Sequence, residues 1–185
     1  MDRRQFLTVA PVMVGLAGCG AEEVDDAAER AALPEPKQVT LVEFNAAGER
    51  TGTVQVPEVI KTDARWKREL PDRAYTVLRK KGTEFAFSGR YNNNHEKGVY
   101  RCGGCGTALF SSSAKFDSGT GWPSFWKPIA EENVRVEQDL SLGMVREEVH
   151  CARCAGHLGH LFPDGPPPTH LRYCINSAAL RFEAA

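Results

Sequence analysis

Cys174 is the residue with the clearest means to do chemistry. Around it, apolar residues alternate with Arg172, Cys174 and Asn176, which predicts a short strand carrying these polar side chains on one outward face. An ordinary thiol is about 3% ionised at pH 7, and a neighbouring guanidinium favours the nucleophilic thiolate. The pattern predicts a reactive cysteine assisted by Arg172; the alternative is a buried structural cysteine.

Two histidines precede this strand. His157 and His160 stand three residues apart in a glycine-punctuated stretch, and a proline-rich loop separates them from Cys174. An imidazole near a thiol can move protons for it, because its ordinary pKa is close to neutral. Both histidines are candidates for catalysis, and the alternative is that they are core histidines.

A second group of residues consists of two Cys-x-x-Cys pairs, Cys102 with Cys105 and Cys151 with Cys154. Such turns offer two thiolates each to a tetrahedral zinc ion, at about 2.3 Å. The insert between the pairs must fold so that it brings them together. Two disulfides or a redox pair are the alternatives, but a duplicated motif favours a closed, structural zinc site. His157 and His160 continue the spacing, yet four thiolates already fill a tetrahedron, so we expect both imidazoles to be free of metal.

A glycine-rich turn presents an aromatic side chain between the two pairs. Gly119 and Gly121 come before Trp122, which is followed by a proline, so the sequence predicts a tight turn that exposes Trp122. This tryptophan is a candidate wall for an apolar substrate pocket. We expect the nearby Phe125 and Trp126 to belong to the core.

The first residues of the chain have the form of an export signal. Paired arginines, Arg3 and Arg4, precede a short apolar segment, as in a twin-arginine signal, and the segment ends at Cys19 as in the lipobox of a bacterial lipoprotein. We expect an exported protein anchored to the cell envelope by lipid on Cys19. The alternative is a chance cysteine after an ordinary apolar segment.

The rest of the chain divides by composition. A formal net charge of −1 argues against nucleic acid as a partner. The expected parts are a signal over residues 1–18, an acylated cysteine and flexible tether over 19–38, a hairpin extension over 39–57 and a main domain over 58–185. We expect the whole to be a monomer.

Short helices and then short strands make up the main domain. One helix is predicted from the cap at Thr62 to Pro71, and a second from Pro71 to the terminator Gly82. From Gly98 onward the pattern is one of short strands broken by glycine, serine and proline. The main domain should therefore be mainly β, with its helices near the N-terminal side.

These motifs, in their order and spacing, resemble the B-type methionine-R-sulfoxide reductases over about residues 58–183. The matching pieces are Lys61-Thr-Asp63 with Trp66, Gly82-Thr-Glu84, both Cys-x-x-Cys pairs, the run from Ser118 to Phe125, His157-Leu-Gly-His160-Leu-Phe162 with Asp164-Gly-Pro166, and Arg172-Tyr-Cys174-Ile-Asn176-Ser177. The resemblance implies two antiparallel sheets with peripheral helices and a structural zinc away from the active site. It also implies reduction of the R epimer of methionine sulfoxide, free or in proteins.

Catalytic roles follow from the resemblance, residue by residue. It implies that Cys174 attacks the sulfoxide sulfur and is left as a sulfenic acid. His160, with His157 and Asn176 near it, would position or protonate the sulfoxide oxygen, and Arg172 would favour the thiolate. For the substrate, it implies that Trp122 packs against the methyl group and that Phe162 lines the same pocket.

This chain departs from many family members at Thr120, where they carry a resolving cysteine. Of its six cysteines, one is expected to carry lipid, four to bind zinc and one to react. We therefore predict a one-cysteine cycle in which a thioredoxin-like protein or a small thiol reduces the sulfenic acid. The alternative function is a zinc-knuckle binding or structural lipoprotein without catalysis. A thiol–disulfide oxidoreductase is disfavoured, because the chain lacks an α/β pattern around its Cys-x-x-Cys pairs.

Overall fold

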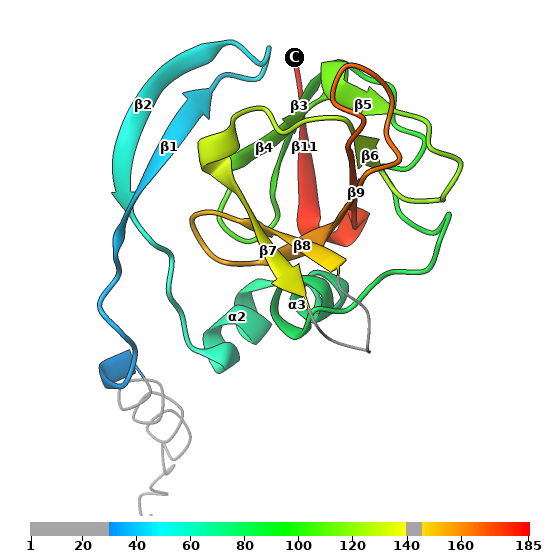
Figure 1. Cartoon of the computed structure of the whole chain (residues 1–185). Helices are drawn as coiled ribbons and strands as arrows, with labels where there is room; N and C mark the ends of the chain where they lie inside the picture. The colour runs from blue at the N-terminus through cyan, green and yellow to red at the C-terminus, as the bar shows by residue number, and fades with distance from the viewer. Residues whose placement is uncertain (1–29, 140–145) are drawn as a thin grey trace, which may run out of the picture.

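A computed structural model describes residues 30–139 and 146–185 of the chain (Figure 1). The expected export signal and the lipid-bearing Cys19 lie outside the described residues. Within the described ranges, no helix has the length and apolar character needed to span a membrane.

The strands form three antiparallel sheets, and this confirms the mainly β fold. A two-stranded sheet pairs β1 (Gln38–Phe44) with β2 (Arg50–Pro57). A six-stranded sheet has the order β5 (Lys115–Phe116), β6 (Ser124–Phe125), β10 (Arg172–Ile175), β9 (His157–Phe162), β8 (Arg146–Cys151) and β7 (Val134–Asp139). A three-stranded sheet has the order β11 (Leu180–Ala184), β3 (Gly98–Cys102) and β4 (Ala108–Ser111).

The core is dominated by aromatic rings that come from both of the larger sheets. Phe125 and Tyr173 come from the six-stranded sheet, and Tyr100 and Phe110 from the three-stranded sheet. The rings of Phe110 and Phe125 stack with centroids 4.4 Å apart, and those of Tyr100 and Phe125 meet edge to face at 5.1 Å. Ring contacts of this kind fix how the sheets pack, and therefore which face of β10 is turned toward the core.

Two short helices lie beside the sheets, as the sequence predicted (Figure 1). Helix α2 (Asp63–Glu69) begins at Thr62, whose hydroxyl accepts a hydrogen bond from the backbone N–H of Arg65. Helix α3 (Asp72–Lys80) ends differently from the prediction, because the left-handed residue is Lys81, with φ 54°, and not Gly82. Gly82 instead donates its backbone N–H to the carbonyl of Thr76.

The N-terminal hairpin is anchored to the main domain by one buried side chain. Asn133 is fully buried, and its amide bonds the backbone N–H and C=O of Val42 and the C=O of Ala108, each at 2.8 Å. Val39 and Leu41 pack on Ala152, which lies between two of the clustered cysteines. Each of these buried polar groups would cost about 1–3 kcal/mol if left unpaired, so Asn133 holds β1 firmly against the Cys-x-x-Cys region.

Candidate active site and metal centre

Adjacent strands of the six-stranded sheet place Glu148, His160, Cys174 and Ser124 in one row. Cys174 on β10 lies directly opposite His160 on β9 and Ser124 on β6. His160 in turn lies opposite Glu148 on β8. Residues directly opposite each other share a face of the sheet, with Cβ atoms about 4.5–5.5 Å apart. Strand pairing therefore brings His160 next to Cys174 and adds two polar neighbours to the predicted site.

The polar face of β10 is covered, which corrects the expectation that it faces outward. Tyr173 and Ile175 point into the core as predicted. On the other face, however, Arg172 is only 7% exposed and Asn176 only 3%. Cys174 is half-buried between them. This face of β10 is therefore largely shielded from solvent and is not an open surface.

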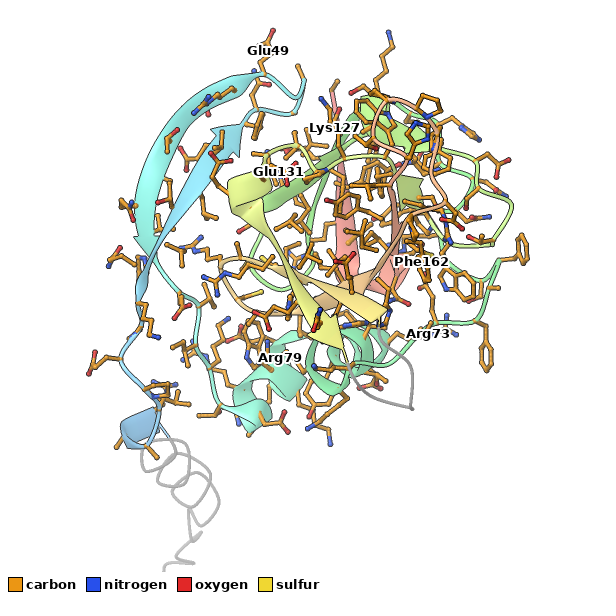
Figure 2. The ribbon with its side chains drawn as sticks, in the orientation of Figure 1. Glu49, Arg73, Arg79, Lys127, Glu131 and Phe162 are labelled. Atoms are coloured by element: carbon orange, nitrogen blue, oxygen red, sulfur yellow. The ribbon has the colours of Figure 1, made fainter. Side chains whose placement is uncertain are left out.

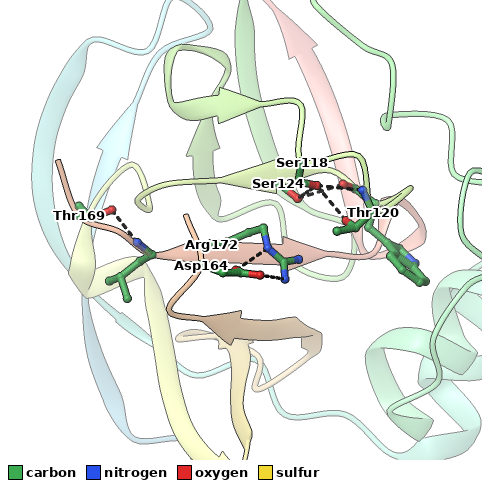
Figure 3. Close-up of polar contacts among 8 residues, drawn as sticks. Ser118, Thr120, Ser124, Asp164, Thr169 and Arg172 are labelled. Carbon is green, nitrogen blue, oxygen red and sulfur yellow. Dashed lines mark hydrogen bonds and ion pairs between the residues drawn. The ribbon is translucent and has the colours of Figure 1, made fainter. Parts of the chain in front are cut away.

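Arg172 is held by an ion pair that sequence reasoning did not assign. Its guanidinium donates two hydrogen bonds to the Asp164 carboxylate, from Nε and Nη2, each at 2.8 Å (Figure 3). It also lies over the ring of Phe162, 4.4 Å from the ring centroid, while Phe162 comes from the neighbouring strand β9 (Figure 2). The ion pair holds the pKa of Asp164 below its usual range and raises that of Arg172. The guanidinium of Arg172 is therefore held in a fixed position beside the Cys174 thiol.

Burial outweighs the expected activation of the thiol. Loss of water around Cys174 raises its pKa, while the charge of Arg172 and a hydrogen bond with Thr120 lower it by a smaller amount. The net result is a pKa above that of an ordinary cysteine. Arg172 favours the thiolate, as the sequence indicated, but burial of Cys174 favours the neutral thiol more strongly.

His157 is fixed by a buried carboxylate. Its Nδ1 lies 2.7 Å from Oε1 of Glu148, whose other oxygen accepts a hydrogen bond from Lys81 at 2.7 Å. Burial raises the pKa of Glu148, but these two partners outweigh it and bring the pKa below the usual range. Burial lowers the pKa of His157 more than Glu148 raises it. The ring centroids of His157 and His160 are 5.4 Å apart. The fixed imidazole of His157 therefore packs against the imidazole of His160, which lies beside Cys174.

Asn176 and Glu84 join the end of β10 to the segment after α3. The Asn176 amide accepts a hydrogen bond from the Glu84 backbone N–H at 3.0 Å and donates one to the Leu158 carbonyl at 3.0 Å. The Glu84 carboxylate accepts hydrogen bonds from the backbone N–H groups of Ser177 and Ala178. Asn176 is therefore placed to position the site through the backbone.

The turn before Trp122 has the predicted glycine conformation, but Trp122 is less exposed than the sequence predicted. Gly119 and Gly121 have φ values of 69° and 91°, in the region that favours glycine, and Trp122 is half-buried with its indole N–H donating to the Glu84 carbonyl at 3.1 Å. Thr120 shares this turn. Its hydroxyl lies 2.8 Å from that of Ser118, which lies 2.8 Å from that of Ser124 (Figure 3).

The prediction that Phe125 and Trp126 belong to the core is confirmed only in part. Phe125 is fully buried, as expected. Trp126 is only half-buried, and Lys127 lies over its ring at 4.7 Å, so the prediction of a core residue was wrong there.

The two Cys-x-x-Cys pairs meet in a single cluster. All four sulfur atoms lie within 4.8 Å of one another, with Cys102 and Cys154 3.6 Å apart and Cys105 and Cys151 3.4 Å apart. A tetrahedron with metal–sulfur bonds of about 2.3 Å has edges of about 3.8 Å, so the cluster fits a zinc ion. Four thiolates this close repel one another, so they can all be ionised here only around a cation. No histidine belongs to the cluster among the described residues.

Sequence reasoning missed several residues that hold the site. Asp164 and Glu84 stood inside recognised motifs without a role, and the structure shows what each bonds. Glu148 had no sequence signal, because its place beside His157 depends on the register of β8 with β9, which an irregularity shifts between Val149 and His150. Its position could be found only from the folded sheet.

The fold and the site together fit a thiol-based redox enzyme whose four clustered cysteines form a separate, possible metal site. The SelR domain family matches residues 70–184. A protein of Bradyrhizobium diazoefficiens called peptide methionine sulfoxide reductase MsrB is 60% identical over 126 residues, which are 68% of this chain and 91% of that protein. Proteins of the same name from Thiobacillus denitrificans and Methanosarcina barkeri are 61% identical over 122 residues and 55% identical over 125, covering 66% and 68% of this chain and 92% and 88% of theirs. The chain belongs to the MsrB family of peptide methionine sulfoxide reductases.

Removal of one cluster thiol should abolish metal binding. We predict that Cys105→Ser lowers the zinc content, measured by elemental analysis, from one ion per chain to nearly none. The melting temperature should fall by more than about 10 °C, because a structural zinc contributes of order 10 kcal/mol to the free energy of folding. Cys174→Ser is the matched control and should keep both its zinc and its melting temperature. A Cys105→Ser protein with full metal content would contradict the assignment.

The buried thiol should react slowly below alkaline pH. We predict that alkylation of Cys174 by iodoacetamide rises with pH and reaches half its maximum above the value of free cysteine, since burial raises its pKa. Arg172→Ala should move this midpoint further up, because it removes the positive charge that favours the thiolate, while Lys127→Ala should not. A midpoint below that of free cysteine, or one unmoved by Arg172→Ala, would show that these are not the controlling interactions.

Proposed function

We propose that this chain reduces methionine R-sulfoxide to methionine by thiol chemistry on Cys174. One observation carries the assignment: of the described cysteines, Cys174 alone stands outside the metal cluster, and it lies cross-strand from His160. Family membership supports the substrate, since relatives at 55–61% identity are named as peptide methionine sulfoxide reductases. The preference for the R epimer rests on the family resemblance.

The proposed step transfers one oxygen atom between two sulfur atoms. The Cys174 sulfur attacks the sulfoxide sulfur and bonds to it, while the sulfur–oxygen bond of the substrate breaks and the oxygen leaves as hydroxide. This hydroxide then bonds to the Cys174 sulfur as the new sulfur–sulfur bond breaks, which leaves a sulfenic acid on Cys174 and releases methionine as a thioether. Cys174 is oxidised by two electrons and methionine is reduced by two. The proton that the leaving oxygen takes up comes from the Cys174 thiol, whose pKa burial raises.

Neighbouring residues serve this transfer in different ways. His160, opposite Cys174, is placed to pass the proton from the thiol toward the oxygen, and His157 orients it from behind. Arg172 stabilises negative charge that develops on the Cys174 sulfur during attack. On the substrate side, Trp122 forms a wall for the methyl group, and Phe162 lines the pocket beside Arg172.

An external thiol is proposed to complete the cycle. It attacks the sulfenic acid, water leaves, and a second thiol equivalent releases the mixed disulfide and restores Cys174. Thr120, in hydrogen-bonding contact with Cys174, occupies the place from which an internal cysteine could resolve it. The donor is a thioredoxin-like protein or a small thiol, and the enzyme acts as a monomer.

The cluster of Cys102, Cys105, Cys151 and Cys154 is proposed to hold a structural zinc. Bound there, zinc ties the two knuckles together and keeps four thiols out of redox chemistry. The cluster offers no further ligand position, so substrate is handled entirely by the residues around Cys174.

Repair outside the cytoplasm is the proposed setting. Support comes from the sequence alone, from Arg3 and Arg4 before the apolar segment and from Cys19 at its end. An acylated Cys19 would tether the enzyme to the cell envelope, where exported proteins are exposed to oxidants.

Turnover of the separated epimers tests the proposed reaction. With dithiothreitol as donor, wild type should reduce the R epimer of a blocked methionine sulfoxide and leave the S epimer unchanged. Cys174→Ser should lose at least about 1,000-fold in kcat/KM, because a hydroxyl is a far weaker nucleophile than a thiol. Unchanged zinc content and melting temperature in Cys174→Ser are the control for folding. A wild type that reduces neither epimer would favour the non-catalytic, zinc-knuckle function.

A further inference from the structure

Two phenylalanines stand out on the surface between α3 and β3. Phe85 is 88% exposed and Phe87 is 69% exposed, the highest values among the large apolar side chains that the structure describes. Single exposed apolar residues are common, but two aromatic rings so close in sequence and both in water indicate a surface that meets another molecule.

The segment that carries these rings is held in a strained conformation. Phe87 has φ 64°, in the left-handed region where a bulky residue is rarely found. Its N–H donates to the Gly121 carbonyl at 2.8 Å, and the Ser88 hydroxyl donates to the Phe85 carbonyl at 2.7 Å. Gly121 must be glycine, because a Cβ there would lie 2.7 Å from the Phe87 nitrogen. Such strain persists where the surrounding structure enforces it, most often at functional sites.

Both ends of this segment are joined to the active site. At one end, the Glu84 carbonyl accepts a hydrogen bond from the Trp122 indole, and its carboxylate binds the backbone at Ser177, just after Asn176. At the other, Phe87 bonds Gly121, which lies between Trp122 and Thr120 in the chain. The segment with the two exposed rings therefore lies next to Trp122, the proposed wall for the substrate methyl group.

A hollow lies beside the first ring. It has a volume of about 290 Å³, and Val77, Phe85 and Ala178 line it together with polar and charged residues: Asp72, Arg73, Thr76, Thr83, Glu84 and Ser88. Apolar atoms nevertheless supply most of its surface, and the hollow lies between α3 and the turn that follows Cys174. An apolar side chain can enter it next to the exposed ring.

We infer that Phe85 and Phe87 form a subsite for an apolar side chain next to the oxidised methionine in a polypeptide substrate. The inference rests on the proposed function and adds where the flanking chain binds and what residues it prefers there. Methionines of protein cores have apolar neighbours, and these become accessible when oxidation loosens the core. Free methionine sulfoxide has no flanking side chain and cannot use the subsite.

Paired substrates isolate this contribution. We would measure kcat/KM for free methionine R-sulfoxide and for two pentapeptides with the R-sulfoxide at the centre, one flanked by leucines and one by serines. Wild type should prefer the leucine peptide. In the double variant Phe85→Ala/Phe87→Ala, the ratio of the leucine peptide to free methionine sulfoxide should fall about tenfold, equivalent to about 1.4 kcal/mol, mainly through KM. Replacing Phe85 by leucine, which keeps an apolar side chain at this position, should retain part of the preference that the double alanine variant loses.

Val136→Ala is the matched control, since Val136 is also exposed but lies on β7, at the far edge of the six-stranded sheet. It should leave every ratio unchanged. An unchanged ratio in the double variant, or an equal loss for the leucine peptide, the serine peptide and the free amino acid, would overturn the subsite while the proposed function stands. Failure of wild type to reduce any of the three would overturn the proposed function and the subsite together.

Discussion

The site depends on the alignment of β9 with β10. This pairing sets Cys174 opposite His160, and a shift by one residue would turn the thiol into the core. Gly159 permits the close approach, because a Cβ there would lie 2.0 Å from the Cys174 carbonyl oxygen. The register is held in turn by Tyr173 and Ile175, which fill the space between the sheets. Aromatic packing in the core therefore places the reactive sulfur on the opposite face.

Two sets of sulfur atoms are kept apart for different uses. The four clustered cysteines are mostly buried and close enough for one cation to bind them all. Cys174 stands alone, half-buried, with Arg172 and Thr120 as its polar neighbours. Burial raises the pKa of this thiol and so favours its protonated form, which reacts more slowly with oxidants than the thiolate does. The charge of Arg172, pinned by Asp164, is then available when the sulfur attacks a substrate.

Local patterns in the sequence predicted local features well. Alternation around Cys174 predicted its strand, the cap at Thr62 predicted α2, and the duplicated motif predicted the cysteine cluster. What the sequence could not predict arises from contacts between distant segments. The cover over Arg172, the carboxylate of Glu148 behind His157 and the net pKa of Cys174 all depend on burial and register. Propensity and spacing carry no information on how much water a folded site excludes.

We propose that Cys174 alone takes the oxygen, and that none of the other described cysteines acts as its partner. The most direct test of this proposal is a single turnover with one equivalent of a peptide carrying methionine R-sulfoxide, without reductant, trapped with dimedone and mapped by mass spectrometry. We expect a dimedone adduct on Cys174 and unmodified cluster cysteines, whereas a Thr120→Cys variant should close an internal disulfide in place of the adduct. An adduct on another cysteine, or a disulfide between Cys174 and a cluster cysteine in the unaltered chain, would contradict the proposal.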